Sequence, residues 1–404
     1  MSTTAHDART HEPLTDQFLG FAFTVDDVPA YYEELRAAGP LLWNETGGFW
    51  VAPRYAEVMT VSTDVAGFRS GAGILTFEIG SPYDTPPTMM HTDPPAHTRY
   101  RKLVQPAFSR GVVREMEAPV RAAARALADA LPLDTPVDVV EHLSVPLPVQ
   151  TIAQVLGLPG DRWGDVWDWS EASIPGTAIY ADDARREALQ EEMRAELRRR
   201  VAEARQAPGS DVVSHLVTTV VDGDHLNDDE LMMFLNQLLV AGNETTRNTI
   251  SGGLVALAEH PDQWARLVAD RSLVASAVEE ILRWTTAVVY FMRTATADTE
   301  LGGVPVRAGD PVVMAYASAN RDEREFGATA NAFDIGRSPN HHLAFGFGAH
   351  FCLGAALARV QVAAVLDALL DRGVQRLDLE GSVGRSVSNV ISGVNRAPMT
   401  LVTK

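Results

Sequence analysis

The chain has 404 residues and a single cysteine, Cys352. One thiol cannot form an intrachain disulfide, and a single cysteine also excludes zinc or iron–sulfur sites built from several cysteines. We therefore expect a protein of a reducing compartment, in which Cys352 acts as a thiol or a thiolate.

Positive charge is also scarce. The 34 Lys and Arg residues face 53 Asp and Glu residues, which gives a formal net charge of −19. Binding to nucleic acid requires a surplus of cations, so general nucleic-acid affinity is excluded. No stretch approaches the ~18 apolar residues of a membrane span, and the amino terminus has no apolar run behind a basic start. These absences predict a soluble, cytoplasmic protein without a membrane anchor.

The composition is otherwise ordinary, with 46% hydrophobic and 22% charged residues, so the chain can build a large core. We find no internal repeat, low-complexity tract or interdomain linker. The simplest prediction is one domain over residues 1–404, mainly α with a minor β-sheet, in which residues 1–20 form a flexible N-terminal arm.

Strand patterns occur near both ends of the chain, in 41–51 and in 300–316, and predict a small sheet built from distant segments. Between them the sequence is mostly helical. The longest predicted helix, 228–259, begins after a capping box of Asn227 and Glu230 and ends before Pro261. At ~1.5 Å per residue it is about 48 Å long, and its apolar middle places it in the core.

The region around the cysteine, 342–370, is a glycine-rich loop followed by an apolar helix. Gly346, Gly348 and Gly354 permit main chain to approach a flat ligand closely. Cys352 stands just before the helix, where unpaired N–H groups and the helix dipole favour a thiolate. An isolated cysteine in such a place is most often an inert core residue, so the surrounding pattern has to decide.

Phe345, Gly348, His350, Cys352 and Gly354 fit the pattern F-x-x-G-x-[HR]-x-C-x-G. Here the chain resembles the cytochrome P450 family. The resemblance implies the triangular, mainly α fold of these haem-thiolate monooxygenases, and haem b (iron protoporphyrin IX) with Cys352 as iron ligand. It also implies that Phe345 packs near the sulfur, that His350 contacts a haem propionate and that Gly354 lies against the haem.

The long helix contains Ala241-Gly242-Asn243-Glu244-Thr245, which matches the family's oxygen-activating A-G-x-[DE]-T segment. The resemblance implies that Ala241 lies at the haem and that Glu244 and Thr245 form an acid–alcohol pair that relays protons. Glycine and threonine there can bend the helix and make room for dioxygen. A polar surface stretch is the alternative, weakened because apolar residues precede it on all helical faces.

Three further sites are implied by the resemblance. Glu280 and Arg283 form the family's E-x-x-R, with Arg337 as third partner in a structural role; alone, such a pair means little, because solvated helices carry many. His97 and Arg101, on one helix face, and Arg293 are expected to bind haem propionates. For each of the propionate ligands a surface salt bridge is the alternative.

The segment from His97 to Arg114 has no acidic residue. In the family this segment borders the cysteine side of the haem, where an acidic ferredoxin docks, so the resemblance implies ferredoxin and ferredoxin reductase as partners that pass on electrons from NAD(P)H. Its five cations are Arg99, Arg101, Lys102, Arg110 and Arg114.

The expected reaction is insertion of one oxygen atom of O2 into a small molecule, by hydroxylation or epoxidation. Two alternatives stay open: a peroxide-driven peroxygenase, which would not need Glu244 and Thr245, and a haem-binding sensor without turnover. The acid–alcohol pair favours the monooxygenase over both.

Family topology places the substrate pocket among mostly apolar side chains, which predicts a mainly hydrophobic substrate. The stretches 241–248, 288–294 and 318–323 resemble actinobacterial members that act on sterol side chains and branched lipids, while other bacterial members tailor the polyketides, terpenoids and peptides of secondary metabolism. The expected pocket residues are Ile74, Leu75, Phe77, Val240, Val288, Val289, Phe291 and Ile391.

Overall fold

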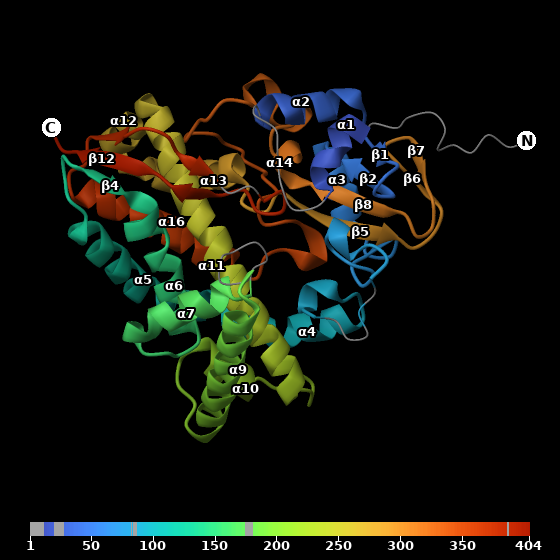
Figure 1. Ribbon diagram of the computed structural model, residues 1–404, viewed down its shortest axis with the longest axis horizontal. Coiled ribbons are helices and arrows are strands. Elements are labelled where there is room, and N and C mark those ends of the chain that lie inside the picture. Colours follow the sequence, from blue (N-terminus) through green and yellow to red (C-terminus); the bar gives the residue numbers. More distant parts are fainter. Residues whose placement is uncertain (1–11, 20–27, 82, 84–86, 174–180, 386–387) are drawn as a thin grey trace, which may run out of the picture. The chain divides into compact units, whose positions relative to one another are not determined.

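The computed structural model describes residues 12–19, 28–81, 83, 87–173, 181–385 and 388–404 (Figure 1). The chain divides into two compact units, each built from separate stretches of sequence. We call them the sheet unit (1–96, 275–352 and 384–395) and the helical unit (97–274, 353–383 and 396–404). The expectation of a single domain over 1–404 stays a prediction.

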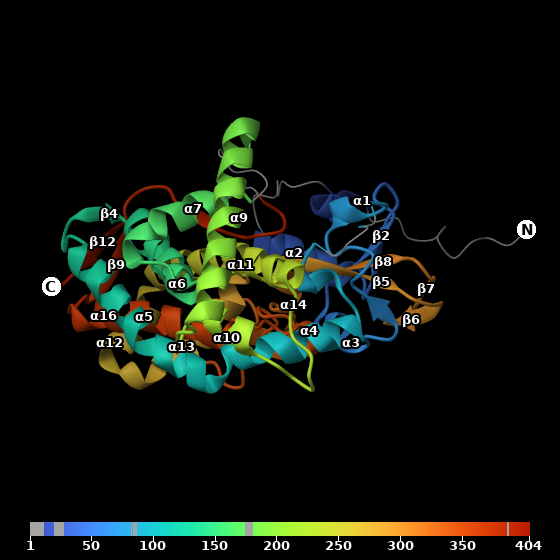
Figure 2. The same ribbon diagram turned by 90° about the horizontal axis from the view of Figure 1, so that it is seen from below.

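The sheet unit contains a five-stranded sheet in the order β1-β2-β8-β5-β3 (Figures 1 and 2). Its one parallel pair is β2 with β8, in which Trp50 is opposite Val312. The sheet is thus built from both ends of the chain, as the sequence predicts. The strands are β1 (Leu42–Asn44), β2 (Phe49–Ala52), β3 (Phe68–Arg69), β5 (Tyr290–Ala295) and β8 (Pro311–Ala315).

Side chains alternate between the two faces of this sheet, as the two-residue period of a strand requires. On β2, Trp50 and Ala52 pack in one hydrophobic cluster with Val58 and Val61 of α3 (Tyr55–Thr63). Phe49 and Val51 pack in a second cluster, with Tyr31 and Leu35 of α2 (Val28–Ala38). Each face of the sheet is therefore covered by a helix from the first part of the chain. The unit also holds α13 (Val274–Thr285) from Ala275 onward, α14 (Tyr316–Ala319), α15 (Glu323–Phe326) and the hairpin of β6 (Thr299–Leu301) and β7 (Val304–Val306).

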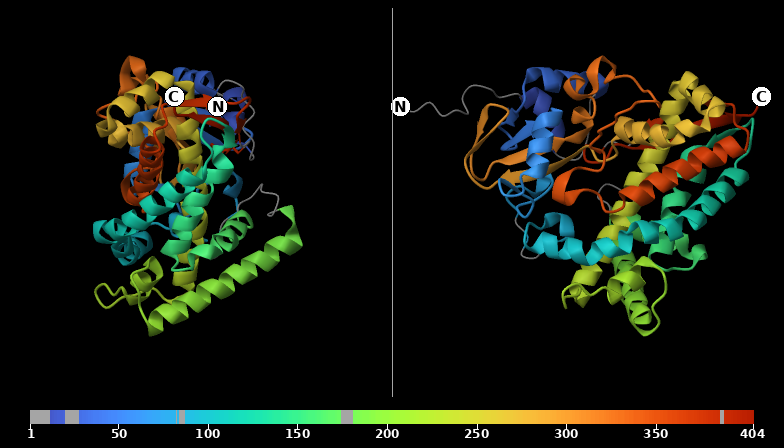
Figure 3. Two further views of the ribbon diagram at one scale, coloured as in Figure 1. Left: turned by 90° about the vertical axis from the view of Figure 1, so that its left-hand side faces the viewer. Right: turned by 180° about the vertical axis from the view of Figure 1, so that it is seen from behind.

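The helical unit is organised around α11 (Asp228–Glu259), which packs against α6 (Pro146–Val155) and α16 (Ala355–Asp371). Helix α5 (Arg110–Ala130) lies alongside α16 (Figure 3). A three-stranded sheet has the order β4-β12-β9. The remaining elements are α4 (Ala96–Val104), α7 (Trp163–Glu171), α9 (Asp183–Gln206), α10 (Val212–Thr218), α12 (Pro261–Ala269), β4 (Pro136–Asp138), β9 (Arg376–Leu379) and β12 (Pro398–Val402).

The boundaries of α11 follow from its capping box. The Asn227 side chain accepts a hydrogen bond from the Glu230 N–H at 2.9 Å, and the Glu230 carboxylate accepts one from the Asn227 N–H at 2.9 Å. This reciprocal pair satisfies two of the backbone donors that a helix start leaves free. At the other end His260 and Pro261 stop the helix.

The N-terminal arm expected over residues 1–20 is only partly described. Residues 12–18 form α1 (Glu12–Thr15) and a 3-10 turn (Asp16–Phe18), and Phe18 is fully buried. The arm therefore does not include Phe18, while residues 1–11 and 20 lie outside the described residues. None of the described helices has the length and apolar character needed to cross a membrane.

Candidate functional site

The cysteine loop of the sheet unit is closed by its own backbone. The Cys352 N–H donates to the Phe345 carbonyl at 3.0 Å, and the Gly346 N–H donates to the Leu343 carbonyl at 2.9 Å. Gly346 and Gly348 have φ values of +65° and +70°, the left-handed region that favours glycine. A Cβ on Gly348 would lie 2.3 Å from the backbone oxygen of Ser62. Both glycines are thus required by the backbone itself.

Gly354 differs from these two. Its φ is −83°, so its backbone could accept any residue, and apart from its neighbours in the chain no described heavy atom lies within 4 Å of an added Cβ. It is the N-cap of α16 and follows Cys352 by two residues. The sequence attributed all three glycines to one cause, whereas Gly354 faces open space. That Gly354 lies against the flat ligand stays a prediction.

Side chains beside Cys352 are aromatic or polar. The ring of Phe345 lies 6.2 Å from that of Phe351 and 6.0 Å from that of His342. His350 Nε2 is 3.2 Å from Ser70 Oγ, and Cys352 itself is half-buried. The packing of Phe345 on the sulfur and the contact of His350 with a propionate stay predictions.

Arg293 on β5 provides a test of whether an anionic cofactor fits. Its side chain is only 7% exposed, and its Nη1 donates to the Met292 carbonyl at 2.7 Å. No acidic side chain among the described residues forms an ion pair with it. Burial lowers the pKa of Arg293, which Tyr316 and Asp93 partly oppose. A buried guanidinium needs a hydrogen-bonded anion, and a haem propionate is such an anion.

His97 and Arg101 belong to the helical unit, on α4. They are four residues apart and therefore lie on one helix face. The His97 side chain is 2% exposed and Arg101 is partly buried. Their spacing fits the predicted propionate contacts, which stay predictions.

The predicted proton relay lies on α11. Glu244 is 17% exposed and its Oε1 is 3.5 Å from Nη2 of Arg247. Nη1 of Arg247 is 3.6 Å from Glu171 at the end of α7. Burial raises the pKa of Glu244, Arg247 lowers it and Glu171 raises it further. Burial thus favours the protonated form of the Glu244 carboxyl group, as a role in proton relay requires.

Thr245 donates its hydroxyl to the Ala241 carbonyl at 2.8 Å, the back-bond expected for threonine in a helix. The helix α11 is continuous from Asp228 to Glu259, and the expected bend stays a prediction. Gly242 has another role, because a Cβ there would lie 2.4 Å from Cδ1 of Ile152 on α6. It permits close packing of two helices rather than weakening one.

Sequence reasoning missed Arg247 and Glu171. Arg247 follows Glu244 by three residues, so helix spacing alone could have pointed to the pair. Glu171 belongs to another helix, and no local rule connects it to Glu244. A second missed contact between α7 and α11 is the hydrogen bond from Asn243 to Ser170 at 3.0 Å, with both residues fully buried.

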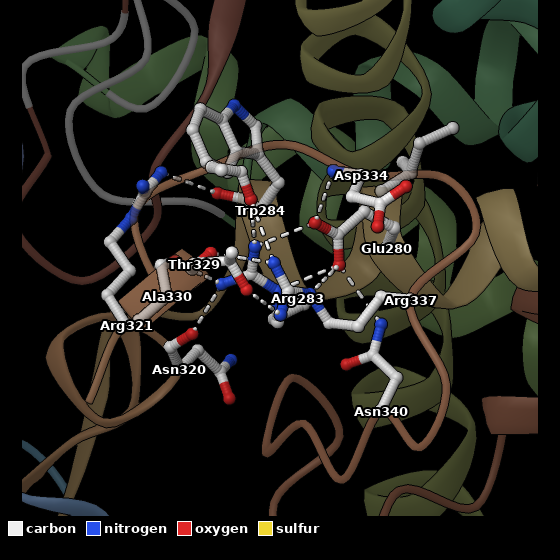
Figure 4. Close-up of polar contacts among 12 residues, drawn as sticks. Glu280, Arg283, Trp284, Asn320, Arg321, Thr329, Ala330, Asp334, Arg337 and Asn340 are labelled. Carbon is white, nitrogen blue, oxygen red and sulfur yellow. Dashed lines mark hydrogen bonds and ion pairs between the residues drawn. The ribbon is translucent and has the colours of Figure 1, made fainter. Parts of the chain in front are cut away.

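The E-x-x-R motif forms a buried network in the sheet unit (Figure 4). Arg283 donates to both carboxylate oxygens of Glu280, at 2.7 and 2.8 Å, and both side chains are fully buried. Arg337, the partner expected from the sequence, donates from Nε to Glu280 at 3.1 Å. The sequence did not point to Asn340, which donates to the same oxygen at 3.1 Å, or to the Asp334 N–H, which donates to the other at 2.9 Å.

The guanidinium of Arg283 also ties two loops together. It donates to the carbonyls of Asn320 and Ala330, both at 2.8 Å, and to that of Ala332 at 2.9 Å. With these bonds the buried charges are all hydrogen-bonded, as buried ions must be. The network therefore fixes the chain that leads into the cysteine loop.

Several predicted pocket segments meet in the sheet unit. The Ile74 carbonyl accepts from the Met292 N–H on β5 at 2.7 Å, and Val288 forms a bridge with Ile391. Phe291 is partly buried in the same unit, whereas Val289 is 3% exposed and packs as a core residue.

The other predicted pocket residues differ in exposure and in unit. Leu75 is partly buried and Phe77 is 42% exposed. Val240, half-buried, belongs to α11 in the helical unit. A polar cavity of about 350 Å³ between Phe326 and His341 contains none of the predicted pocket residues.

The basic segment is less uniform than its sequence. Arg99 forms ion pairs with Asp224 and Glu230, both at 2.6 Å, so acids from distant sequence already neutralise it. Arg110 and Arg114, one turn apart on α5, are exposed. Lys102 is exposed as well, so these three are the exposed cations of the segment.

Comparison with known proteins gives a consistent result. The family model described as Cytochrome P450 matches residues 178–372. Linalool 8-monooxygenase from Pseudomonas putida is 34% identical, over 92% of this chain and 95% of its own. A steroid C26-monooxygenase from Mycolicibacterium smegmatis is 36% identical, over 96% of both. The structure of cytochrome P450 CYP268A2 from Mycobacterium marinum, in complex with pseudoionone, superposes with a TM-score of 0.82 at 35% identity, covering 93% of this chain and 95% of that one.

Proposed function

Because the chain belongs to the cytochrome P450 family of monooxygenases, we propose that it hydroxylates a neutral, branched terpenoid or sterol with Cys352 as the haem-iron ligand. The observation that carries the proposal is the cysteine loop. Two left-handed glycines shape its backbone, and a third, Gly354, has open space beside it. Family membership implies haem iron, O2 and electrons derived from NAD(P)H; that the haem is haem b is part of the proposal.

The residues that would hold the haem are those that match the motifs of the family. Cys352 would bind the iron, and Gly354 and Ala241 would lie against the macrocycle. Arg293, His350, His97 and Arg101 would pair with its propionates, which supplies the anion that a buried Arg293 requires. When bound, thiolate-ligated haem iron supplies the oxygen activation.

The protein's own contribution to catalysis is proton supply. Glu244 would supply the proton from its carboxyl group, because burial raises its pKa and so favours the protonated form. Thr245 lies one residue further along the helix, and its hydroxyl becomes available to pass on a proton once it leaves the Ala241 carbonyl. A positioned acid of this kind contributes about 10²–10⁴-fold to a rate.

The substrate class rests on the apolar pocket segments and on the relatives. Ile74, Val288, Phe291 and Ile391 present no charge to a ligand, which favours a neutral, hydrophobic molecule. The relatives named above act on linalool or on steroids, and the solved structure holds pseudoionone. Epoxidation and the tailoring of other secondary-metabolite scaffolds are compatible with the same lining.

Ferredoxin and ferredoxin reductase are the proposed electron donors, with the exposed Arg110 and Arg114 on the docking surface. An acidic partner would be steered toward these cations. A cytoplasmic location stays a prediction.

The ligand assignment is tested by Cys352→Ser. The variant should lose the red-shifted ferrous–carbonyl Soret band that marks thiolate ligation, whereas the parent protein shows it. Survival of that band in the variant would overturn the assignment. A spectral-shift titration of the parent with terpenoids, sterols, fatty acids and macrolides then tests the substrate class, which fails if only charged ligands or none displace the iron-bound water.

The two alternatives make different predictions for Thr245→Ala. A monooxygenase should consume NADH without matching product and release more peroxide, whereas a peroxygenase should be unaffected. A sensor would give no product with any reductase. These outcomes separate the three functions.

A further inference from the structure

Three predicted pocket residues, Ile74, Leu75 and Phe77, lie in one segment of the sheet unit. A buried carboxylate, that of Glu78, holds this segment. Glu78 is 6% exposed, and its Oε2 accepts hydrogen bonds from the N–H groups of Ile74 at 2.7 Å and Leu75 at 3.1 Å. Its Oε1 accepts from the Tyr83 hydroxyl at 2.8 Å and lies 3.2 Å from Nε2 of His91. The Glu78 side chain thus connects Ile74 and Leu75 to Tyr83 and His91.

His91 completes the closure. It is 7% exposed, its Nδ1 lies 2.8 Å from the Thr88 hydroxyl, and the Tyr83 ring packs edge-on against it at 5.1 Å. Both ring nitrogens are therefore engaged, which fixes the orientation of the imidazole. We call Glu78, Tyr83, Thr88 and His91 the clasp.

The first part of the segment is also fixed to the sheet. The Ile74 carbonyl accepts from the Met292 N–H at 2.7 Å, and the Thr76 hydroxyl lies 2.9 Å from that of Tyr290. The Thr76 hydroxyl also donates to the Phe18 carbonyl at 2.7 Å. The sheet therefore holds Ile74 and Thr76, and Glu78 of the clasp also holds the N–H groups of Ile74 and Leu75.

The carboxylate is matched to this role. Burial alone would raise the pKa of Glu78, but hydrogen bonds from His91, Ile74 and Tyr83 bring it below its usual value. Four donors satisfy the hydrogen-bonding capacity of this ionised carboxylate, so it does not require a hydrogen bond from a substrate. Phe77, next to it in sequence, is 42% exposed. Phe77 is therefore exposed while the charge of Glu78 and the side chain of Ile74, which is 3% exposed, are buried.

We propose that the Glu78–His91 pair positions Ile74, Leu75 and Phe77, and thereby determines which neutral hydrophobic substrates the enzyme accepts. This role rests on the proposed function, because it assumes that these three residues line the pocket. The pair acts through the segment and does not itself touch the substrate. It is a positioning pair whose charge is hidden from the ligand.

The test uses the haem-loaded enzyme and two variants. Glu78→Ala removes all four contacts of the carboxylate, and His91→Asn removes the imidazole with its contacts to Glu78, to the Thr88 hydroxyl and to the Tyr83 ring. The matched control is Glu325→Gln, which removes the negative charge from a His–Glu contact of the same 3.2 Å length, with His341, in which the side chains are 65% and 31% exposed. An exposed pair should contribute little.

Hydrogen exchange measured by mass spectrometry is the first readout, without substrate. Glu78→Ala should speed exchange about tenfold or more in peptides of 70–81 and 87–92, since bonds to a charged acceptor are among the strongest. His91→Asn should act mainly on 87–92, and Glu325→Gln on neither. Exchange within about twofold of the parent in both clasp variants would overturn the proposal.

Substrate discrimination is the second readout. Spectral dissociation constants for a small terpenoid and a sterol should change in ratio by about fivefold or more in His91→Asn, roughly the effect of one buried contact, with an unchanged melting temperature. A faster exchange with an unchanged ratio means a merely structural role and overturns the positioning claim. If no ligand shifts the parent spectrum, the proposed function fails, and the exchange data alone decide whether the clasp exists.

Discussion

The guanidinium of Arg247 lies 3.5 Å from the carboxylate of Glu244, one helical turn earlier on α11. It also lies 3.6 Å from Glu171 and 5.2 Å above the ring of Trp167. All three charged side chains are between 15% and 17% exposed. Two carboxylates that share one cation leave an excess negative charge away from water. Burial is the main cause that raises the pKa of both carboxyl groups, and Arg247 lowers both. Glu171 raises the pKa of Glu244 further, and Asp168 does the same for Glu171.

The first prediction concerns the pH profile of product formation. A step that needs protonated Glu244 slows as the pH rises through its pKa. Glu171→Gln removes a neighbouring negative charge, so it should lower that pKa and move the alkaline limb to lower pH. Arg247→Gln removes the positive charge and should move the limb to higher pH. The control is Asp165→Asn, on α7 but paired with Arg162, which should leave the alkaline limb in place. If the limb moved in the same direction in both test variants, the contacts of Arg247 with Glu244 and Glu171 would not set the pKa of Glu244.

The second prediction concerns stability and needs no turnover. A carboxyl group whose pKa is raised on folding stabilises the protein fully below its unfolded pKa, and this stabilisation is lost as the pH rises through its folded pKa. Glu244→Gln has no proton to lose. The free energy of unfolding of the parent should therefore fall relative to the variant as the pH rises, in urea titrations at several pH values. The exposed control Glu187→Gln should run parallel to the parent, and a parallel course for Glu244→Gln would refute the raised pKa.

A third prediction follows from the network of Glu280. Glu280→Gln leaves Arg283 and Arg337 buried with less negative charge, which costs about 3–5 kcal/mol when one partner of a buried pair is removed. Denaturant unfolding should show this loss. Glu279→Gln is the matched control, because Glu279 is the preceding residue on α13, 29% exposed, and glutamine can still accept from His342. Equal losses in the two variants would mean that burial of the network contributes nothing.

Local spacing rules explain what could be predicted from the sequence. Asn227 and Glu230 are three residues apart, and the capping box fixes the start of α11 at the predicted residue. Glu280 and Arg283 obey the same spacing. Arg337 required the family pattern, since nothing local relates it to a helix that ends more than fifty residues earlier.

The contacts that could not be predicted from the sequence are those between different secondary-structure elements. Glu171 contacts Arg247 only because α7 packs on α11. The charge of Arg99 is neutralised by an ion pair with Asp224, which is distant from it in the sequence. Gly242 and Gly354 were both assigned from what glycine permits, but their causes differ. Ile152 crowds the first, whereas the second faces open space.

The fourth prediction separates two glycines of the cysteine loop. Gly348→Ala combines a positive φ with a Cβ 2.3 Å from a backbone oxygen of Ser62, so it should cost about 2–4 kcal/mol in unfolding experiments. Gly354→Ala meets no atom of the described chain and should cost less than about 1 kcal/mol. It should nevertheless speed haem loss to a scavenging protein, because its methyl group enters the space assigned to the haem. Unchanged haem loss in Gly354→Ala would place the haem elsewhere.

The last prediction concerns electron transfer. Arg110 and Arg114 are exposed on α5, whereas Arg99 is held by two acids, so the sequence overstates the charge available to a partner. If an acidic ferredoxin docks here, Arg110→Glu and Arg114→Glu should each slow reduction at low ionic strength and weaken its salt dependence, because steering between opposite charges is screened by salt. Arg307→Glu, at an exposed arginine of the sheet unit, changes the net charge equally. Stopped-flow measurement of the reduction rate at several salt concentrations should distinguish these variants. If the docking surface is local, the two α5 variants are reduced more slowly and Arg307→Glu is reduced at the parent's rate. Equal slowing in all three would mean that only net charge matters.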